Sequence, residues 1–411
     1  MSRALESTTI AAAERELAVH NGVVLAGITA GHAVSHFLHQ SFLVMLPALR
    51  DALGIDAVQI GAIMTAREFA SGLSSVPGGI LCDRFSRQWG RVMALCMAAF
   101  ALGWVAVALS ANYYVLVLGM IIVSVSASIW HLPSMAALSY HFARRRGTAL
   151  AIHGVGGNIG DVLGPVATGL TLTYLTWRGV LSIYAVVPLL LALGSLWAFR
   201  GIGPQENGLS RSPGLGMQLR QSVHLLRNPI LWRVNLIFGL RGMCYQIYTT
   251  FLPLFLADEV GFGAKEIGFH LGLLFVIGIV ASPLMGYASD RVGRKAVVVP
   301  TLLSSAVLSL ALALFGQGPA LTVIIALLGL VLRSDYSILS AAALDIVGHD
   351  VATTTLGVLS FSRFVMAASA PLIAGAMYER WGMDPPLYLV TVLFALAGVL
   401  LATTRLTHQP A

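Results

Sequence analysis

Residues 286–295 read GYASDRVGRK and repeat, with changes, residues 79–87, which read GILCDRFSR. Each copy follows a long apolar run, and in each an Asp-Arg pair is followed by a further arginine. An acid and several arginines at a helix end can lock neighbouring helices through charge-assisted hydrogen bonds. The two copies predict a chain of two repeated halves. The expected lock residues are Gly79, Asp83, Arg84 and Arg87 in the first copy and Gly286, Asp290, Arg291 and Arg294 in the second.

The composition places these halves in a membrane. The chain has 411 residues, of which 57 % are hydrophobic and 10 % are charged, whereas a soluble domain has about 25 % charged residues. A soluble fold could not bury so much apolar surface, because its core grows more slowly than its surface. This excludes a cytosolic enzyme, a disordered chain and a nucleic-acid binder. The three cysteines form neither a disulfide framework nor a zinc-binding pattern.

Twelve apolar runs are long enough to span a bilayer, which takes about 20 residues of helix. We therefore expect an all-α integral membrane protein with twelve transmembrane helices in two six-helix bundles. The predicted domains are residues 1–200, a linker at 201–229 and residues 230–411, and an amphipathic helix is expected at 217–228 within the linker. The runs are 22–49, 57–81, 90–110, 113–138, 148–173, 178–199, 230–256, 264–288, 296–316, 319–343, 353–377 and 386–404.

Basic residues predict the orientation, because cytoplasmic loops carry an excess of lysine and arginine. With a cytoplasmic N-terminus, the outer loops hold only Arg50, Arg178, Lys265 and Arg380. The inner loops hold fifteen basic residues, among them those of both GxxxDR copies and of 144–146. We therefore expect a multi-pass protein of the inner (cytoplasmic) membrane with both termini in the cytoplasm, in contact with lipid.

These features carry a resemblance to a family. The 6+6 plan and the repeated loop pattern G-x-x-x-D-R-x-x-R-[KR] are similar to the major facilitator superfamily; the first copy departs from the pattern at Ser86 and Gln88. The fifth run, with GDVLGPVATG at 160–169, resembles a glycine-proline motif of antiporters in that family. Segments at 128–131, 145–148 and 154–165 resemble its fosmidomycin-resistance exporters. The family's drug/proton antiporters usually carry an arginine in the fourth span, and 114–137 has none.

Charged residues inside the apolar runs need partners, since each costs about 2.5–3.5 kcal/mol at the centre of a membrane helix. Neighbours on one helix point about 100° apart, so their partners are expected on other helices or on a ligand. One interpretation is an anion site made by the arginines, with Arg241 and Arg333 favoured because the resemblance puts spans 7 and 10 at the cavity. The other is a set of interhelical salt bridges. The residues are Arg67, Glu68, Asp161, Arg241, Arg333, Asp335 and Arg363.

Histidines recur on one face of the first run at 32, 36 and 39, beside Gln40. A proton relay, a metal site and a polar cavity wall are all compatible with this spacing; the wall is favoured, with His32, His36 and Gln40 contacting substrate, and no metal is expected. His131, His153 and His270 are expected to be satisfied interior hydrogen bonders.

Three carboxylates are the predicted proton carriers: Asp161 as first choice, then Glu68 and Asp335. Asp161 lies in a stripe of small residues, Gly156, Gly160 and Gly164, followed by Pro165, which predicts close helix packing or a hinge. Two aromatic residues, Tyr245 and Tyr336, are expected near the charges, where they could stack on substrate.

The resulting hypothesis is a secondary transporter working by alternating access, with proton-coupled export of an organic anion or zwitterion. Uptake of a carboxylate or phosphorylated metabolite by proton symport remains open, as does a membrane-bound enzyme or receptor. The exporting direction is implied by the resemblance alone. The expected partners are a small molecule and protons, with no cofactor, and the chain is expected to be a monomer.

Overall fold

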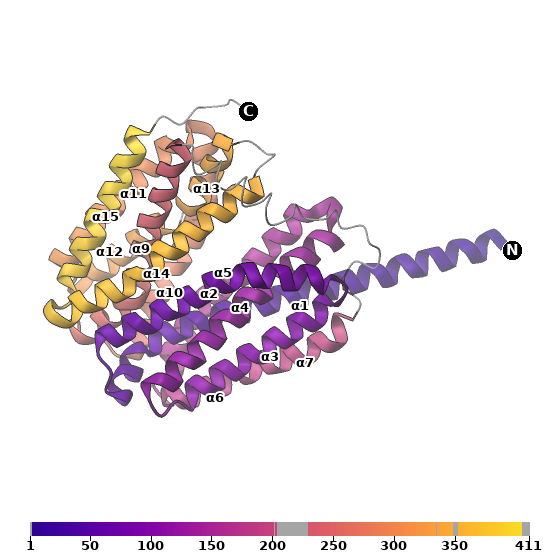
Figure 1. Ribbon diagram of the computed structural model, residues 1–411, viewed down its shortest axis with the longest axis horizontal. Helices are drawn as coiled ribbons and strands as arrows, with labels where there is room; N and C mark the ends of the chain where they lie inside the picture. The colour runs from indigo at the N-terminus through magenta and orange to yellow at the C-terminus, as the bar shows by residue number, and fades with distance from the viewer. Residues whose placement is uncertain (1, 201, 204–228, 334, 348–351, 405–411) are drawn as a thin grey trace.

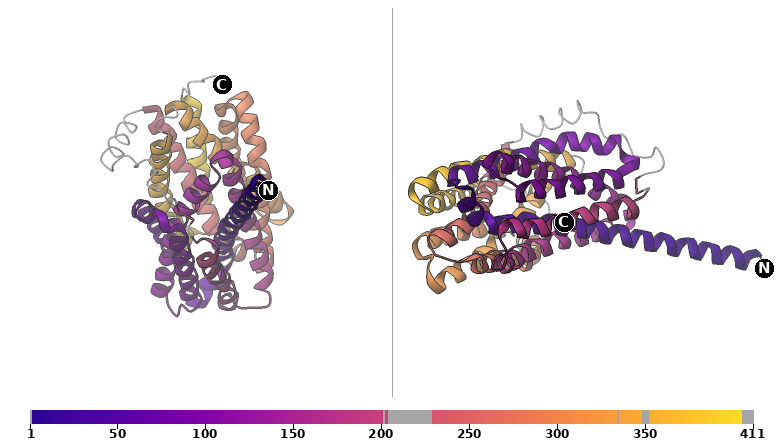
Figure 2. Two further views of the ribbon diagram at one scale, coloured as in Figure 1. Left: turned by 90° about the vertical axis from the view of Figure 1, so that its right-hand side faces the viewer. Right: turned by 90° about the horizontal axis from the view of Figure 1, so that it is seen from below.

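The computed structural model describes residues 2–200, 202–203, 229–333, 335–347 and 352–404, and within these it describes all side chains except those of 2–20, 76, 336–337, 344–347 and 352–363. Every regular element in the described part is helical. Figure 1 shows two groups of helices, one early in the chain and one late, and the views in Figure 2 show the same two groups in contact.

The early group contains the helices that precede the long connection. They are α1 (Ser2–Leu53), α2 (Ala57–Arg84), α3 (Trp89–Ala108), α4 (Tyr113–His141), α5 (Arg146–Thr171), α6 (Trp177–Tyr184) and α7 (Val186–Ala198). Two short 3-10 turns, η1 (Ser86–Gln88) and η2 (Ala143–Arg145), connect α2 to α3 and α4 to α5. Side-chain caps begin α2, α4 and α6: the Asp56 side chain, for example, accepts from the Gln59 amide in a capping box at α2.

The late group repeats this plan after the linker. It contains α9 (Pro229–Asp258), α10 (Ala264–Val292), α11 (Arg294–Phe315), α12 (Gly318–Leu332), α13 (Asp335–Val347), α14 (Ala352–Trp381) and α15 (Asp384–Thr403). Two predicted spans are each made of two helices: 178–199 is divided into α6 and α7 at Ala185, and 319–343 into α12 and α13 after Leu332. The predicted span 22–49 is part of the longer α1. Nearly all of the predicted linker, including 217–228, lies outside the described residues.

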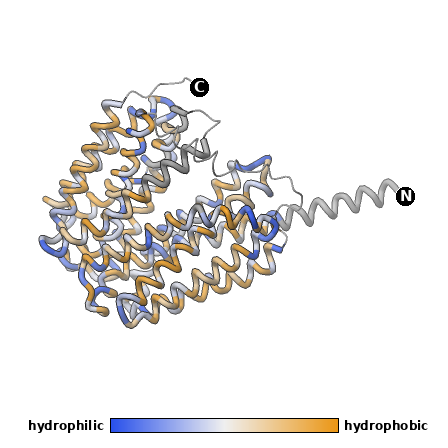
Figure 3. The backbone as a smooth tube through the Cα atoms, in the orientation of Figure 1, coloured by the Kyte–Doolittle hydropathy of each residue, from blue (hydrophilic) through white to orange (hydrophobic). Residues whose placement is uncertain are grey.

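The predicted fold class, an all-α membrane protein of twelve spans, is confirmed. Among the described residues, six helices are long and apolar enough to cross a membrane by length and composition: α3 (with η1), α4, α6 with α7, α10, α11 and α15. The helices α1, α2, α5, α9 and α14 are not among them, and these are the helices that carry His36, Arg67, Asp161, Arg241 and Arg363. Figure 3 shows hydrophobic residues along most helices, with hydrophilic ones gathered mainly at helix ends.

The two halves are packed tightly at one end, which we call the closed end; it carries the ends of α1 and α9 and the starts of α2 and α10. A Cβ at Gly61 would lie 2.3 Å from the Pro371 carbonyl oxygen, where α2 meets α14, and a Cβ at Gly268 would lie 2.4 Å from the carbonyl oxygen of Pro165, where α10 meets α5. Small residues permit such close backbone approach between membrane helices. From this end the two groups diverge in Figure 1.

An ion pair joins the halves at the closed end. Arg50, at the end of α1, donates to both carboxylate oxygens of Asp258, at the end of α9, at 2.5 and 2.7 Å. Tyr378 of α14 donates to the same carboxylate at 2.7 Å. Burial acts to raise the pKa of Asp258, but the hydrogen bonds from Arg50 and Tyr378 outweigh it and hold this pKa below its usual value.

The opposite end, which we call the open end, carries the two GxxxDR loops. Arg294 of α11 forms an ion pair with Asp290 of α10 and donates to Ser289 Oγ at 2.9 Å, so this copy joins two consecutive helices. Gly293 has φ +95°, a conformation that favours glycine. The first copy has Ser86 at the equivalent place, and there the chain forms the 3-10 turn η1 instead. The sequence difference between the copies therefore corresponds to a different backbone path.

Candidate functional site

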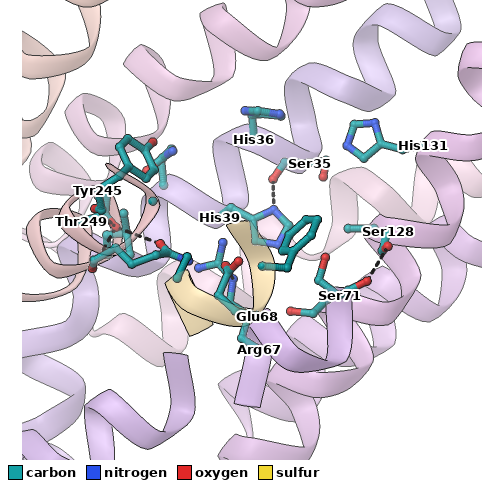
Figure 4. A pocket seen from close by; sticks show the side chains of 18 residues that line it. Ser35, His36, His39, Arg67, Glu68, Ser71, Ser128, His131, Tyr245 and Thr249 are labelled. Carbon is teal, nitrogen blue, oxygen red and sulfur yellow. Dashed lines mark hydrogen bonds and ion pairs between the residues drawn. The ribbon is translucent and has the colours of Figure 1, made fainter. Parts of the chain in front are cut away.

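A polar cavity of about 330 Å³ lies between the two groups of helices (Figure 4). Three early helices and two late ones contribute to its wall. The lining residues are Ser35, His36, His39, Gln40 and Leu43 of α1, Arg67, Glu68 and Ser71 of α2, Ser124, Ala127, Ser128 and His131 of α4, Gly242, Tyr245, Gln246 and Thr249 of α9, and Phe364 and Ala367 of α14.

Helical spacing explains how these side chains reach one place. The lining positions of α1 from 35 to 43 recur one helical turn apart, as do positions 242, 245, 246 and 249 of α9. Figure 4 shows Tyr245 and Thr249 on one side of the cavity and Ser128 and His131 on the other. The serines of α2 and α4 could not be predicted from the sequence, because isolated serines in an apolar helix give no periodic signal.

Arg67 and Glu68 bring opposite charges to the cavity wall. Their side chains are 18 % and 14 % exposed, and the nearest guanidinium nitrogen lies 4.0 Å from the Glu68 carboxylate. That separation is too long for a hydrogen bond. It fits the expectation that helical neighbours cannot form a compact ion pair, and it leaves both groups able to hydrogen-bond a ligand.

Asp161 of α5 lies deep in the protein, with its side chain 1 % exposed. His36 Nδ1 and Gln40 Nε2 donate to its Oδ1 at 2.8 and 2.9 Å, and Arg333 Nη1 donates to its Oδ2 at 2.7 Å. Both oxygens are therefore engaged. Since Arg333 follows α12 in the late group, this ion pair joins the two halves in the interior of the protein.

Arg241 of α9 is paired within the late group. Its Nε donates to Asp335 Oδ1 at 2.5 Å and its Nη2 to the Leu332 carbonyl at 2.8 Å. Leu332 ends α12 and Asp335 begins α13, so this guanidinium holds together the two helices into which the tenth predicted span is divided. Both side chains are buried, at 5 % and 0 % exposure.

The predicted arginine site is thus dispersed in this structure. Arg67 lines the cavity, while Arg241 and Arg333 are bound to carboxylates and do not line it. The side chains of Arg363 and Tyr336 lie outside the described residues, and Tyr245 lines the cavity. Of the predicted proton carriers, Glu68 lines the cavity, and Asp161 and Asp335 are held by arginines.

Four histidines gather beside the cavity. The ring of His32 lies 4.5 Å from that of His36, 4.9 Å from that of His131 and 4.0 Å from that of His153, measured between centroids. His32 Nδ1 donates to the His153 carbonyl at 2.7 Å. The expectation of satisfied hydrogen bonds is right for His270, which binds the Glu266 carbonyl and Thr322. It is wrong for His153, whose buried ring nitrogens contact no hydrogen-bonding group of the described chain.

The glycine stripe of α5 packs directly on α1. A Cβ at Gly156, Gly160 or Gly164 would lie 2.6, 2.2 or 2.5 Å from the carbonyl oxygens of Thr29, Ala33 and Phe37, respectively. Pro165 continues the stripe within α5. The close contact fixes α1 against α5, and this register places His36 and Gln40 at hydrogen-bonding distance from Asp161.

Two groups of helices that together line a polar cavity and are joined by ion pairs are the arrangement of a membrane transporter. The family model of the Major Facilitator Superfamily matches residues 28–280 and 235–411, and the chain belongs to this family. Its relatives and structural neighbours are transporters and not enzymes, and this protein is likewise a transporter.

Three comparisons give the range of that similarity. The chain is 24 % identical to the fosmidomycin resistance protein of Escherichia coli (strain K12), over 92 % of this chain and 91 % of that protein. It is 22 % identical to the glycerol-3-phosphate transporter of Bacillus subtilis (strain 168), over 94 % of this chain and 93 % of that protein. A bacterial homologue of the human lysosomal transporter Spinster, in an inward-facing and occupied conformation, superposes with a TM-score of 0.78 at 16 % identity, over 94 % of this chain and 95 % of that one.

Proposed function

We propose that this protein is a proton-coupled exporter of a small organic anion or zwitterion and that its solute binds in the cavity beside Arg67 and Glu68. The observation that carries the proposal is this pair of opposite charges, exposed to a cavity that both halves line. A cavity of about 330 Å³ suits a small solute. Arginine grips carboxylate and phosphate groups in a fork, so it would bind the anionic group. Glu68 would receive a solute's cationic group, which favours a zwitterion.

We assign the two predicted bundles, 1–200 and 230–411, to the units that rock against each other. Glycines support this assignment. On α2 and α10, Gly61 and Gly268 touch the other half at the closed end, whereas a Cβ added at Gly79 or Gly286, at the open end, would have no atom of the described chain within 4 Å. Small residues at both ends would let either end close. The excess of basic residues at the open end supports a cytoplasmic location for that end.

Glu68 is the proton carrier that the geometry favours. It reaches the cavity, and Arg67 is the charged group beside it, at 4.0 Å. The other titratable groups of the same wall are His36, His39, His131 and Tyr245. Asp161, the first choice on sequence grounds, is enclosed by three donors, so we assign it to the connection between the halves. Protonation of Glu68 would remove the charge that holds a zwitterion's cationic group, so proton and solute would compete for the site, as an exchange of one for the other requires.

The link between Asp161 and Arg333 would open or shift when the halves move apart. Removing one member of a buried ion pair costs about 3–5 kcal/mol. A free-energy cost of this order would keep the two conformations distinct. They could still interconvert if solute or water replaced the lost contacts of Asp161 and Arg333. We therefore expect the breaking of this ion pair to limit the change between the inward-open and outward-open states.

The test is flux in proteoliposomes that contain the purified protein, with an imposed pH gradient and a panel of matched anionic, zwitterionic and cationic solutes. We expect pH-driven movement of an anion or zwitterion that Arg67→Gln and Glu68→Gln each reduce at least tenfold. Lys265→Gln and Glu266→Gln, which change exposed residues at the start of α10 that do not line the cavity, are the matched controls. Preferred movement out of right-side-out vesicles supports export, and accumulation supports the uptake alternative. Normal flux in both cavity variants would contradict the proposal.

A further inference from the structure

We propose that His32, His36 and His131 form a binding site for a divalent transition-metal ion at the edge of the cavity. One ring nitrogen from each of the three histidines lies within 4.8 Å of those of the other two. His32 and His36 come from α1, one turn apart, and His131 comes from α4. Figure 4 shows His36 and His131 at the same edge of the cavity. The inference does not depend on what the protein transports.

The surroundings of two of these histidines orient them as metal ligands. His32 Nδ1 contacts the His153 carbonyl at 2.7 Å, and His36 Nδ1 contacts the Asp161 carboxylate at 2.8 Å. Carbonyl and carboxylate oxygens only accept, so Nδ1 carries the proton in both rings. The lone pair of each neutral ring is then on Nε2, free to bind a metal. Metal-ligating histidines usually donate their other N–H to a carbonyl or carboxylate in this way.

His131 and His153 complete the cluster. The ring of His131 has no hydrogen bond to any described residue, and it lies 4.9 Å from the ring of His32. His153 is 3 % exposed, and neither of its ring nitrogens has a partner within the described chain. Its ring stacks on His32 with a centroid separation of 4.0 Å. Buried polar groups are normally satisfied, so a cluster of four imidazoles in which the buried His153 ring has no partner is not explained by packing alone.

The ligand chemistry selects the metal. Imidazole nitrogen suits Zn²⁺, Co²⁺, Ni²⁺ and Cu²⁺, whereas Mg²⁺ and Ca²⁺ prefer oxygen. Zinc–nitrogen bonds of about 2.0–2.1 Å in a tetrahedral site separate the nitrogens by about 3.4 Å. Side-chain rotations that bring the nitrogens closer by up to about 1.4 Å would therefore complete the site. Since His36 and His131 line the cavity, the fourth position faces it and is open to water or to an anionic group.

The experiment uses the purified full-length protein, stripped with a chelator. Cobalt(II) absorption and zinc(II) calorimetry are measured at neutral pH for the parent and for His36→Gln, His131→Gln and the matched control His270→Gln. His270 is a buried histidine of α10 with both ring nitrogens hydrogen-bonded, outside the cluster. For the parent we expect one metal ion per chain and the absorption spectrum of tetrahedral cobalt(II). The affinity for the metal should be at least tenfold weaker in His36→Gln and His131→Gln and unchanged in His270→Gln. Thermal unfolding checks that each variant is folded.

A further variant tests the orienting contact. Asp161→Asn keeps an oxygen that accepts from His36 but removes the charge, and loss of such a partner typically weakens metal binding about 10–100-fold. The site would be overturned by failure of the folded parent to bind zinc or cobalt, or by equal binding in His36→Gln, His131→Gln and the control. Metal binding is measured without solute or gradient, so its outcome is separate from that of the flux experiment.

Discussion

Arg333 Nη1 lies 2.7 Å from Asp161 Oδ2, and this contact joins the two halves of the chain at a depth where the carboxylate is 1 % exposed. The same carboxylate accepts from His36 and Gln40 of α1. One acid therefore connects α1, α5 and the late group. Through His36 and Gln40, which line the cavity, it contacts the cavity wall, and through His36 it contacts the histidine cluster.

Arg333→Ala should destabilise the protein, because it leaves Asp161 buried without its counter-charge. The expected loss is about 3–5 kcal/mol in the free energy of unfolding, which thermal unfolding in detergent would detect. Arg333→Lys keeps the charge and should lose less. If Arg333→Ala is as stable as the parent, the pair is not holding the halves together. In the double variant with Asp161→Asn, the losses should be less than additive.

Arg67→Gln should abolish the thermal stabilisation given by an anionic or zwitterionic solute. A ligand at about 100 times its dissociation constant adds about 2.7 kcal/mol to stability. Melting curves of the parent with matched anionic, zwitterionic and cationic compounds identify the solute class, and the variant is then measured with the same hits. Lys265→Gln should keep the shift. A shift caused only by cations would indicate that Arg67 is structural and that the solute is a cation.

The closed end should loosen in acid. Since the pKa of Asp258 is lowered in the folded protein, its ion pair with Arg50 stabilises the fold at pH values above the usual carboxylate range and this contribution disappears as pH falls through the lowered pKa. For this partly exposed pair the contribution is about 1 kcal/mol or less. Asp258→Asn should therefore melt slightly earlier than the parent at pH 7, and the difference should be smaller at a pH below the usual carboxylate range. An equal difference at both pH values would contradict this account.

Gly160→Val should disrupt folding, whereas Gly154→Val on the same helix should be tolerated. A Cβ at Gly160 would lie 2.2 Å from the Ala33 carbonyl oxygen, while one at Gly154 would have no described atom within 4 Å. Overpacking typically costs about 1–3 kcal/mol. Yield of folded protein in size-exclusion chromatography and melting temperature would measure the difference. Equal behaviour of the two variants would show that α1 and α5 are not packed this closely.

Particular elements show how far the sequence determined the fold. The apolar runs predicted the spans, because a bilayer requires about 20 apolar residues of helix. The repeated GxxxDR loops predicted the two halves, and the Ser86 for glycine change marked the place where the first loop takes another path. The sequence did not predict that spans six and ten are each made of two helices. In span ten the break lies at a tertiary contact, the bonds from Arg241 to Leu332 and Asp335.

The sequence by itself determined which residues need partners: a charge or a histidine in an apolar helix is costly wherever it lies. Only the tertiary structure decided what those partners are. It paired Arg333 with Asp161 and Arg241 with Asp335, placed Arg67 and Glu68 at the cavity, and brought His131 of α4 to the histidines of α1. Helical periodicity fixes the face of one helix on which a residue lies. The contacts between helices follow from packing at the glycines of α5 and at the closed end, which no single run of sequence encodes.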